Sequence, residues 1–387
     1  MSKLMKWLAI GSAALLCTNA YAMTKESSWS NHLVNIIDGA NMHASVLADG
    51  NYVFAQNING DAPALVIMDT TGGVVDHVTV GISSASTYGF DIDNDGNYLL
   101  AGGVRSSLNG DPATYKQAYI AKIDAALNIV NEVAYSLTPQ EQLAEAGFYA
   151  IESDLNGNYY GLYFEYSVVK SVHVVKFDNA LTPLASVDLS LSEGTWGDIK
   201  MLSDGNVLVA YSDTLQVLDS ELNVVSSQVY PEYRFKEITL SDQEIFVTAS
   251  IGTPVTGNQS IAQYDPSTLL ALDEYILSPV VLEPNNLEVV NSVVLNGRVY
   301  VTADGDNDAT SSDIYVYELA KSNLSSGIVS EVKIGGSGWE SAGPIMVDNN
   351  LKLISTATTR SLDGDFPEDD SILGSRIATT TINVDVE

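Results

Sequence analysis

The sequence predicts an all-β protein, a seven-bladed β-propeller with four antiparallel strands in each blade. Three observations lead to this prediction: a strand–turn–strand pattern recurs seven times, helix signals are scarce, and no stretch has the composition of a linker. The chain has 387 residues, more than the roughly 250 to 300 that one hydrophobic core usually serves. A ring of small repeated sheets solves this problem, because each sheet buries its faces against its neighbours.

The first recurring feature is a tight turn between two apolar strands. Asp-Gly, Asn-Gly and related pairs tolerate the positive φ angles of two-residue hairpins, so each turn predicts a hairpin. The fifth and seventh copies lack glycine. The seven turns are Asp49-Gly50-Asn51, Asp95-Gly96-Asn97, Asn156-Gly157-Asn158, Asp204-Gly205-Asn206, Asp242-Gln243-Glu244, Asn296-Gly297-Arg298 and Asp348-Asn349-Asn350.

The second recurring feature is a third strand that ends in an acidic residue and is followed by a fourth strand. The sixth unit has Glu318 at this place, and the seventh supplies only a strand. Each unit covers roughly 40 to 60 residues, which is the length of a propeller blade. A β-solenoid and a pair of β-sandwiches are the alternatives. The acidic residues of the first five units are Asp69, Asp124, Asp178, Asp219 and Asp265.

The two ends of the chain predict how the ring closes. Residues His32 to Asp38 have the pattern of a strand before the first unit, and the last unit ends after its third strand. We therefore expect the N-terminal strand to complete the last blade, which removes two exposed sheet edges. The one helical signal is Pro139 to Ala146.

The first 22 residues have the pattern of a secretory signal peptide. Lys3 and Lys6 precede an apolar run from Trp7 to Cys17, and Ala20-Tyr21-Ala22 is a small-x-small cleavage site. We expect cleavage after Ala22, a periplasmic or secreted location, and a single propeller over residues 23–387. The apolar run is too short to span a membrane, so no membrane insertion is expected. Cys17 is the only cysteine, which excludes disulfides from the remaining chain.

The composition restricts the class of partner. Asp and Glu number 49 against 17 Lys and Arg, and the formal net charge is −32. This charge repels nucleic acid and anionic membranes and attracts cations, although surface acid also serves solubility alone. We expect a monomer that binds a glycan or a protein.

Two segments resemble the repeats of bacterial secreted β-propeller proteins. One runs from Gly96 to Ser136, and the other comprises Gly335 to Gly338 and Arg360 to Pro367. The resemblance is close over these segments and loose over the seven units. It implies a seven-bladed disc with an unknown or binding function, and it transfers no catalytic motif.

Acidic loops between second and third strands are candidate calcium sites, with Ca²⁺ as the candidate cofactor. Ca²⁺ takes six to eight oxygen ligands with loose geometry, which clustered carboxylates on a loop can supply. The alternative is that Asp, Asn and Gly fill exposed turns for conformational reasons. The candidate ligands are Asp304, Asp306, Asp308 and Asp313 in one cluster and Asp363, Asp365, Glu368, Asp369 and Asp370 in the other.

Aromatic residues at the entry of several first strands are candidate ligand-binding residues. First strands line the central channel of a propeller, so these rings are expected near its mouth. Exposed aromatics beside acids suit carbohydrate stacking or a protein contact, whereas blade packing is the structural alternative. The residues are Tyr88, Phe148, Trp196, Phe235 and Trp339.

These features predict an exported, non-catalytic binding or scaffold protein that engages a glycan or a protein through its loop face, with Ca²⁺ as an aid. The histidines His32, His43, His77 and His173 lack metal-ligand spacing, and no nucleophile or phosphate-binding motif is present. The main alternative is an extracellular polysaccharide-active enzyme, a hydrolase or lyase on the same scaffold. A third possibility is a purely structural module of an envelope or matrix.

Overall fold

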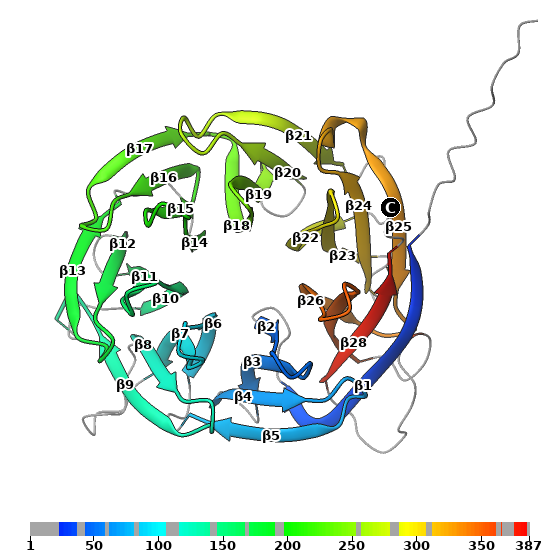
Figure 1. Cartoon of the computed structure of the whole chain (residues 1–387), viewed down its shortest axis with the longest axis horizontal. Coiled ribbons are helices and arrows are strands. Elements are labelled where there is room, and N and C mark those ends of the chain that lie inside the picture. Colours follow the sequence, from blue (N-terminus) through cyan, green and yellow to red (C-terminus); the bar gives the residue numbers. More distant parts are fainter. Residues whose placement is uncertain are drawn as a thin grey trace, which may run out of the picture.

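The computed structural model describes residues 23–36, 43–58, 62–80, 85–105, 116–139, 145–166, 170–189, 197–252, 257–278, 286–306, 312–360, 365 and 375–384. These residues form five four-stranded sheets and one eight-stranded sheet, arranged in a ring around a central axis (Figure 1). The eight-stranded sheet comprises two blades that touch at a single residue pair, so the ring has seven blades. The predicted seven-bladed β-propeller is therefore confirmed.

Each blade runs from an inner strand at the axis to an outer strand at the rim. Blades 1 to 4 are β2 (His43–Val46), β3 (Tyr52–Ile58), β4 (Ala62–Met68), β5 (Val74–Thr79); β6 (Ala85–Ile92), β7 (Tyr98–Arg105), β8 (Lys116–Ile123), β9 (Ile129–Tyr135); β10 (Glu145–Ser153), β11 (Tyr159–Tyr166), β12 (Lys170–Phe177), β13 (Pro183–Asp188); and β14 (Gly197–Met201), β15 (Val207–Tyr211), β16 (Thr214–Leu218), β17 (Val224–Val229).

Blades 5 to 7 complete the ring. They are β18 (Tyr233–Ser241), β19 (Glu244–Ile251), β20 (Asn258–Tyr264), β21 (Ala271–Leu277); β22 (Asn286–Leu295), β23 (Arg298–Asp306), β24 (Ser312–Ala320), β25 (Ile328–Ile334); and β26 (Glu340–Val347), β27 (Leu353–Thr359), β28 (Ser375–Asn383) with β1 (Thr24–Ile36). A short 3-10 helix, η3 (Leu324–Ser326), precedes β25. The helix predicted over Pro139–Ala146 is wrong at its C-terminal end, where Glu145 and Ala146 begin β10.

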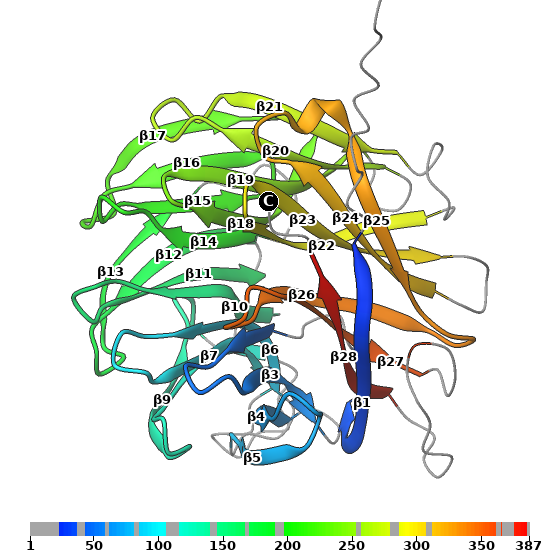
Figure 2. The ribbon, with the colours of Figure 1, turned by 45° about the vertical axis from the view of Figure 1, so that its right-hand side comes forward.

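The N-terminal strand closes the ring as predicted. β1 lies beside β28 as the outer strand of blade 7, with Thr24 opposite Asn383 and Ile36 opposite Ser375 (Figure 2). The strand begins at Thr24, eight residues before the predicted start at His32. Lys25 adds an ion pair to Asp365 at 2.5 Å, so charge attraction reinforces the ladder at the seam.

Hydrophobic packing occurs at the junctions between blades. The buried apolar residues fall into seven clusters, and each cluster joins one pair of adjacent blades. At the junction of blades 2 and 3, for example, Leu99 and Ile120 pack against Phe148, Tyr159 and Phe177. This arrangement lets a long chain bury apolar surface without one large core, since each sheet uses both of its faces.

All seven predicted turns join the inner strand of a blade to its second strand. Their conformation differs from the predicted two-residue form in most copies. Leu47 accepts a hydrogen bond from Gly50 N at 2.9 Å, and Gly50 then takes a φ of 89°, which is a type I turn followed by a left-handed glycine. Of the seven turns, Asn296-Gly297 has positive φ at both residues, 50° and 73°.

Acidic residues at the ends of third strands stabilise the turns that follow them by accepting hydrogen bonds from the turn. Asp124 Oδ1 accepts the backbone N–H groups of Ala126 at 3.0 Å and Asn128 at 2.8 Å. Hydrogen bonds from Ser267 and Thr268 lower the pKa of Asp265 to about 2 in the same way. Much of the recurring acid in this sequence therefore stabilises turns. None of the helical segments in the described part of the chain is long and apolar enough to cross a membrane.

Candidate functional site

The axis of the disc holds a cavity of about 460 Å³ that all seven inner strands line. This volume lies within the range of about 300 to 1,000 Å³ that is typical of small-molecule sites. Most of the lining residues lie in the N-terminal and middle parts of the inner strands, and Asp304 comes from the second strand β23. The cavity therefore faces the side of the disc where connections between blades enter, which is the side predicted to bind ligands.

Several residues that line the cavity lie at β-bulges of the inner strands. In five inner strands the pairing with the second strand skips at least one residue, which is the mark of a β-bulge. A bulge turns an extra side chain out of the regular alternation and aims it at a new direction. Bulge residues that line the cavity are Tyr88 in β6, Tyr149 in β10, Lys236 in β18, Val290 in β22 and Pro344 in β26.

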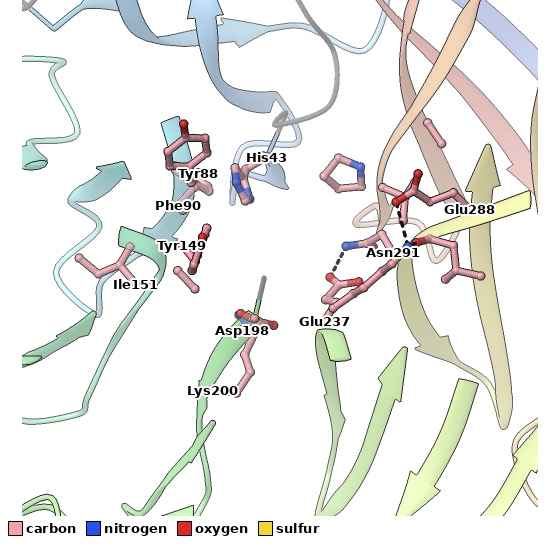
Figure 3. Close-up of a pocket in the computed structure, with 18 of the residues that line it drawn as sticks. His43, Tyr88, Phe90, Tyr149, Ile151, Asp198, Lys200, Glu237, Glu288 and Asn291 are labelled. Atoms are coloured by element: carbon pink, nitrogen blue, oxygen red, sulfur yellow. Dashed lines mark hydrogen bonds and ion pairs between the residues drawn. The ribbon is translucent and has the colours of Figure 1, made fainter. Parts of the chain in front are cut away.

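One side of the cavity is aromatic. Tyr88, Phe90, Tyr149 and Ile151 lie along this side, and they come from blades 2 and 3 (Figure 3). Tyr149 stacks on Phe164 with ring centroids 4.0 Å apart and an interplanar angle of 16°. The half-buried Tyr88 ring lies 6.3 Å from both of these rings. Because packing fixes the rings before any ligand arrives, little side-chain entropy is lost on binding.

The opposite side of the cavity is charged, and each of its two lysines is paired with acid. Lys200 Nζ lies 3.1 Å from Glu152 and 4.0 Å from Asp198. Lys236 Nζ lies 2.9 Å from Glu288 and donates further hydrogen bonds to a glutamine side chain and a backbone carbonyl. Figure 3 shows Asp198, Lys200 and Glu288 among the side chains around the cavity.

Burial shifts the protonation of several groups at this site. It raises the pKa of Glu152 to about 7, although the Lys200 charge opposes the shift. Burial and the nearby Asp198 charge raise the pKa of Glu237 well above its ordinary value. Burial also lowers the pKa of His43 to about 4, which leaves its imidazole neutral at pH 7. The site thus combines neutral and charged groups whose charge states respond to their surroundings.

A series of hydrogen bonds joins successive inner strands around the axis. In each link a carboxyl or amide side chain accepts a backbone N–H of the next blade, so the positions of the lining side chains are coupled from blade to blade. The links are Asp91 to Ser153 N at 2.8 Å, Glu152 to Met201 N at 3.5 Å, Asp198 to Ile238 N at 2.9 Å, Glu237 to Ser292 N at 3.1 Å and Asn291 to Ile345 N at 3.1 Å.

The structure places the predicted aromatic residues differently from one another. Tyr88 lines the cavity. Phe148 and Phe235 are 0% and 1% exposed and pack between blades, so the packing alternative describes them. Trp339 is 43% exposed just before β26, outside the cavity lining, and Trp196 lies outside the described residues.

Sequence reasoning missed the residues beside two of these aromatics. The bulges place Tyr149 and Lys236, each one position after a predicted aromatic, at the cavity. It also missed Asp198, Glu237 and His43. The sequence signal for such a residue is a polar or aromatic side chain directly after the buried aromatic of a first strand. Regular strand alternation would place that side chain on the face of the strand opposite to the aromatic.

Three members of the predicted calcium clusters, Asp304, Asp313 and Asp365, bind protein groups. Asp304 accepts hydrogen bonds from Ala342 N and from Ser341 Oγ, the latter at 3.2 Å. Asp313 pairs with Lys333 at 2.6 Å, and Asp365 accepts Gly335 N at 3.0 Å besides its bond to Lys25. Asp306 ends β23 opposite Ser312. Asp308, Asp363, Glu368, Asp369 and Asp370 lie outside the described residues.

The described residues also lack the geometry of a metal site. Among the residues that the structure describes, no three or more histidine, cysteine, aspartate or glutamate side chains converge as a metal site would require. Calcium binding at the acidic loops stays a prediction, because most of its proposed ligands fall outside the described ranges.

Comparison with known proteins bears on the fold. No protein-family model and no curated protein matches the chain. The WD40 domain of Pan2 from Neurospora crassa matches with a TM-score of 0.56 and 8% identity, over 95% of this chain and 98% of that chain. A chain of the Mitotic Checkpoint Complex gives a TM-score of 0.55 and 10% identity, over 99% of both chains.

A third match is an extracellular domain assigned to a hybrid two-component system of B. thetaiotaomicron. It gives a TM-score of 0.53 and 12% identity, over 92% of this chain and 41% of that chain. At such identities the likeness shows the β-propeller fold alone. Ligand and activity must be argued from the site.

Proposed function

We propose that the protein is a non-catalytic binding propeller that holds one ring of a glycan in its axial cavity. The observation that carries the proposal is the pair of opposed walls: bulges turn Tyr88 and Tyr149 into the cavity on one side, and carboxyl and amide groups face them from the other. The cavity is large enough for a sugar ring and is preorganised by the packing described above.

The chemistry of a sugar ring suits these two walls. A pyranose has apolar C–H faces that can lie against an aromatic ring, and hydroxyl groups around its edge that donate hydrogen bonds. Asp198 and Asn291 offer oxygen acceptors on the polar wall. A flat hydrophobic ligand would shield these oxygens from water without offering them a further hydrogen bond, so it suits the polar wall less well than a sugar ring does.

Export belongs to the proposal as well. It is supported by the signal pattern of residues 1–22 and by the extracellular domain among the structures that share the fold. N-terminal sequencing of the protein recovered from outside the cytoplasm tests it, and the expected first residue is Met23.

Binding to a panel of soluble oligosaccharides, followed by calorimetry, tests the proposed site. We expect the Tyr88→Ala variant to lose about 1 kcal/mol of binding free energy, close to fivefold in Kd, because it removes one aromatic face. Tyr88→Phe keeps the face and should bind like the wild type. Trp339→Ala is the matched change on an exposed aromatic outside the cavity. If Trp339→Ala weakens binding and Tyr88→Ala does not, the ligand binds the loops instead of the cavity.

Calcium is tested separately, by titration of the protein with Ca²⁺. The prediction for the acidic loops is a heat of binding that the Asp363→Ala variant loses. Absence of both a heat and a melting shift in the wild type removes calcium from the proposal and leaves the axial site unaffected.

A polysaccharide-active enzyme is the second candidate. It is favoured by Glu152 and Glu237, whose raised pKa values resemble those of general acids. Product detection on a polysaccharide panel separates the candidates. Turnover that Glu237→Gln abolishes, without a change in folding, would replace the binding proposal.

A further inference from the structure

We infer that the axial cavity selects a ligand that carries a protonated amine, of the amino-sugar class, and rejects uronates and other acidic sugars. This inference rests on the proposed function, because it specifies the kind of ring that the same cavity binds. Three features of the cavity support it: the pairing of the two lysines, the excess of carboxyl groups and the aromatic wall.

Lys236 has no ammonium hydrogen left for an acidic ligand. Lys236 Nζ donates to Glu288 Oε1 at 2.9 Å, to Val289 O at 3.1 Å and to Gln259 Oε1 at 3.2 Å. An ammonium group has three hydrogens, and these three acceptors use them. Lys200 lies between Glu152 and Asp198 on the same wall. A ligand carboxylate would have to displace one of the three bonds of Lys236 before it could pair with that ammonium group.

Carboxyl groups outnumber ammonium groups around the cavity. Asp198, Glu288 and Asp304 line it against two lysines, and the carboxyl group of Glu237, whose pKa is raised, lines it as well. Glu288 is 66% exposed, so its carboxylate can meet a ligand in the cavity as well as Lys236. The remainder of the molecule adds to this field, because its formal net charge is −32. A cation is therefore attracted to the cavity and an anion is repelled from it.

The aromatic wall acts in the same direction. The face of an aromatic ring carries negative charge density, and it attracts a cation that lies within about 6 Å of its centroid. Tyr88 and Phe90 present such rings to the cavity opposite the acidic wall. A sugar whose amine lies between the two walls satisfies both of them, whereas a neutral sugar uses only the stacking and the hydroxyl contacts.

The experiment compares four oligosaccharide series of equal length by calorimetry: glucosamine, N-acetylglucosamine, glucose and glucuronate. We expect the glucosamine series to bind about tenfold more tightly than the two neutral series, with added salt weakening this advantage, and the uronate series to bind most weakly. Equal affinity for amine and neutral sugars overturns the inference and leaves the proposed function intact. Binding of none of the four series overturns the proposed function itself.

A charge reversal tests whether the cavity is responsible. Glu288→Lys is expected to weaken glucosamine binding about tenfold and to improve uronate binding. Glu331→Lys makes the same charge change on the exposed outer strand β25 and is expected to leave both affinities near those of the wild type. If Glu331→Lys has the same effect as Glu288→Lys, the preference arises from the charge of the whole protein, and the inference is refuted.

Discussion

Replacing Glu152 with glutamine tests the electrostatics of the axial site directly. Glu152 is the carboxyl group whose side chain is 18% exposed and lies 3.1 Å from Lys200. It also belongs to the series of hydrogen bonds that joins blade 3 to blade 4. Glutamine keeps the shape and one acceptor oxygen but cannot ionise, so the substitution isolates the free energy of ionisation.

The size and sign of the effect follow from the pKa of Glu152, which burial raises from 4.5 to about 7. A carboxyl group with a higher pKa in the folded state binds a proton on folding, so its contribution to stability falls as pH rises from 4.5 through about 7. Between pH 5 and pH 8 this group should lower the free energy of unfolding by about 2.5 kcal/mol. The glutamine variant lacks this loss.

The measurement is urea unfolding of the wild type and of Glu152→Gln at a series of pH values. We expect the two proteins to differ by less than about 1 kcal/mol at pH 5, because Glu152 is then neutral in the folded state. The variant should gain stability relative to the wild type as pH rises to 8. Glu331→Gln, on the exposed strand β25, is the control and should follow the wild-type curve. Parallel curves for the wild type and Glu152→Gln between pH 5 and 8 would refute the reasoning.

Three further outcomes can be checked by unfolding measurements. Lys122 Nζ lies 3.5 Å from Asp93 Oδ2 in a buried ion pair whose side chains are 7% and 5% exposed, and Asp93 also accepts a hydrogen bond from the turn that follows it. Asp93→Ala should therefore lower the free energy of unfolding by about 3 to 5 kcal/mol, and Lys122→Met should lower it by less. Equal losses would contradict this expectation. Gly102→Ala should cost about 2 to 4 kcal/mol, because its Cβ would meet the Ser86 carbonyl oxygen at 1.8 Å; an unchanged melting temperature would contradict it. The pKa of Asp265 is lowered from 3.8 to about 2, so the stability contributed by its ionised form is present above pH 3.8 and is lost as pH falls through about 2. The stability advantage of the wild type over Asp265→Asn should therefore shrink over that range.

The fold could be predicted because its signals are local and repeated. A turn such as Asp95-Gly96-Asn97 between two apolar runs specifies a hairpin wherever it occurs, and seven such hairpins at blade spacing leave few architectures. The missing outer strand of the last unit then predicts closure by the N-terminus. The exact start of the closing strand was not predictable, because Thr24 to Asn31 have little apolar alternation, and their strand conformation comes from pairing with β28.

The recurring acid illustrates a different limit. The sequence alone does not distinguish a loop aspartate that binds a cation from one that accepts hydrogen bonds from its own turn. In the described turns the backbone is the partner, as at Asp124, whose oxygen accepts two N–H groups of the turn. A regular spacing, in which an aspartate precedes an asparagine or threonine by four residues, distinguishes the turn use and can be read from the sequence.

The axial site was less predictable, because the side chain that reaches the axis depends on the bulges. Regular alternation would place Phe148 and Ala150 on one face of β10 and Tyr149 on the other, but the ladder skips a residue there, and both Tyr149 and Ala150 line the cavity. The bulge lies at a contact between blades, where Gly89 in β6 approaches the Ala150 backbone so closely that a Cβ would lie 2.9 Å away. A single-sequence pattern carries no information about that neighbour. The chemistry of the site is therefore a property of the closed ring, formed only when all seven inner strands meet around the axis.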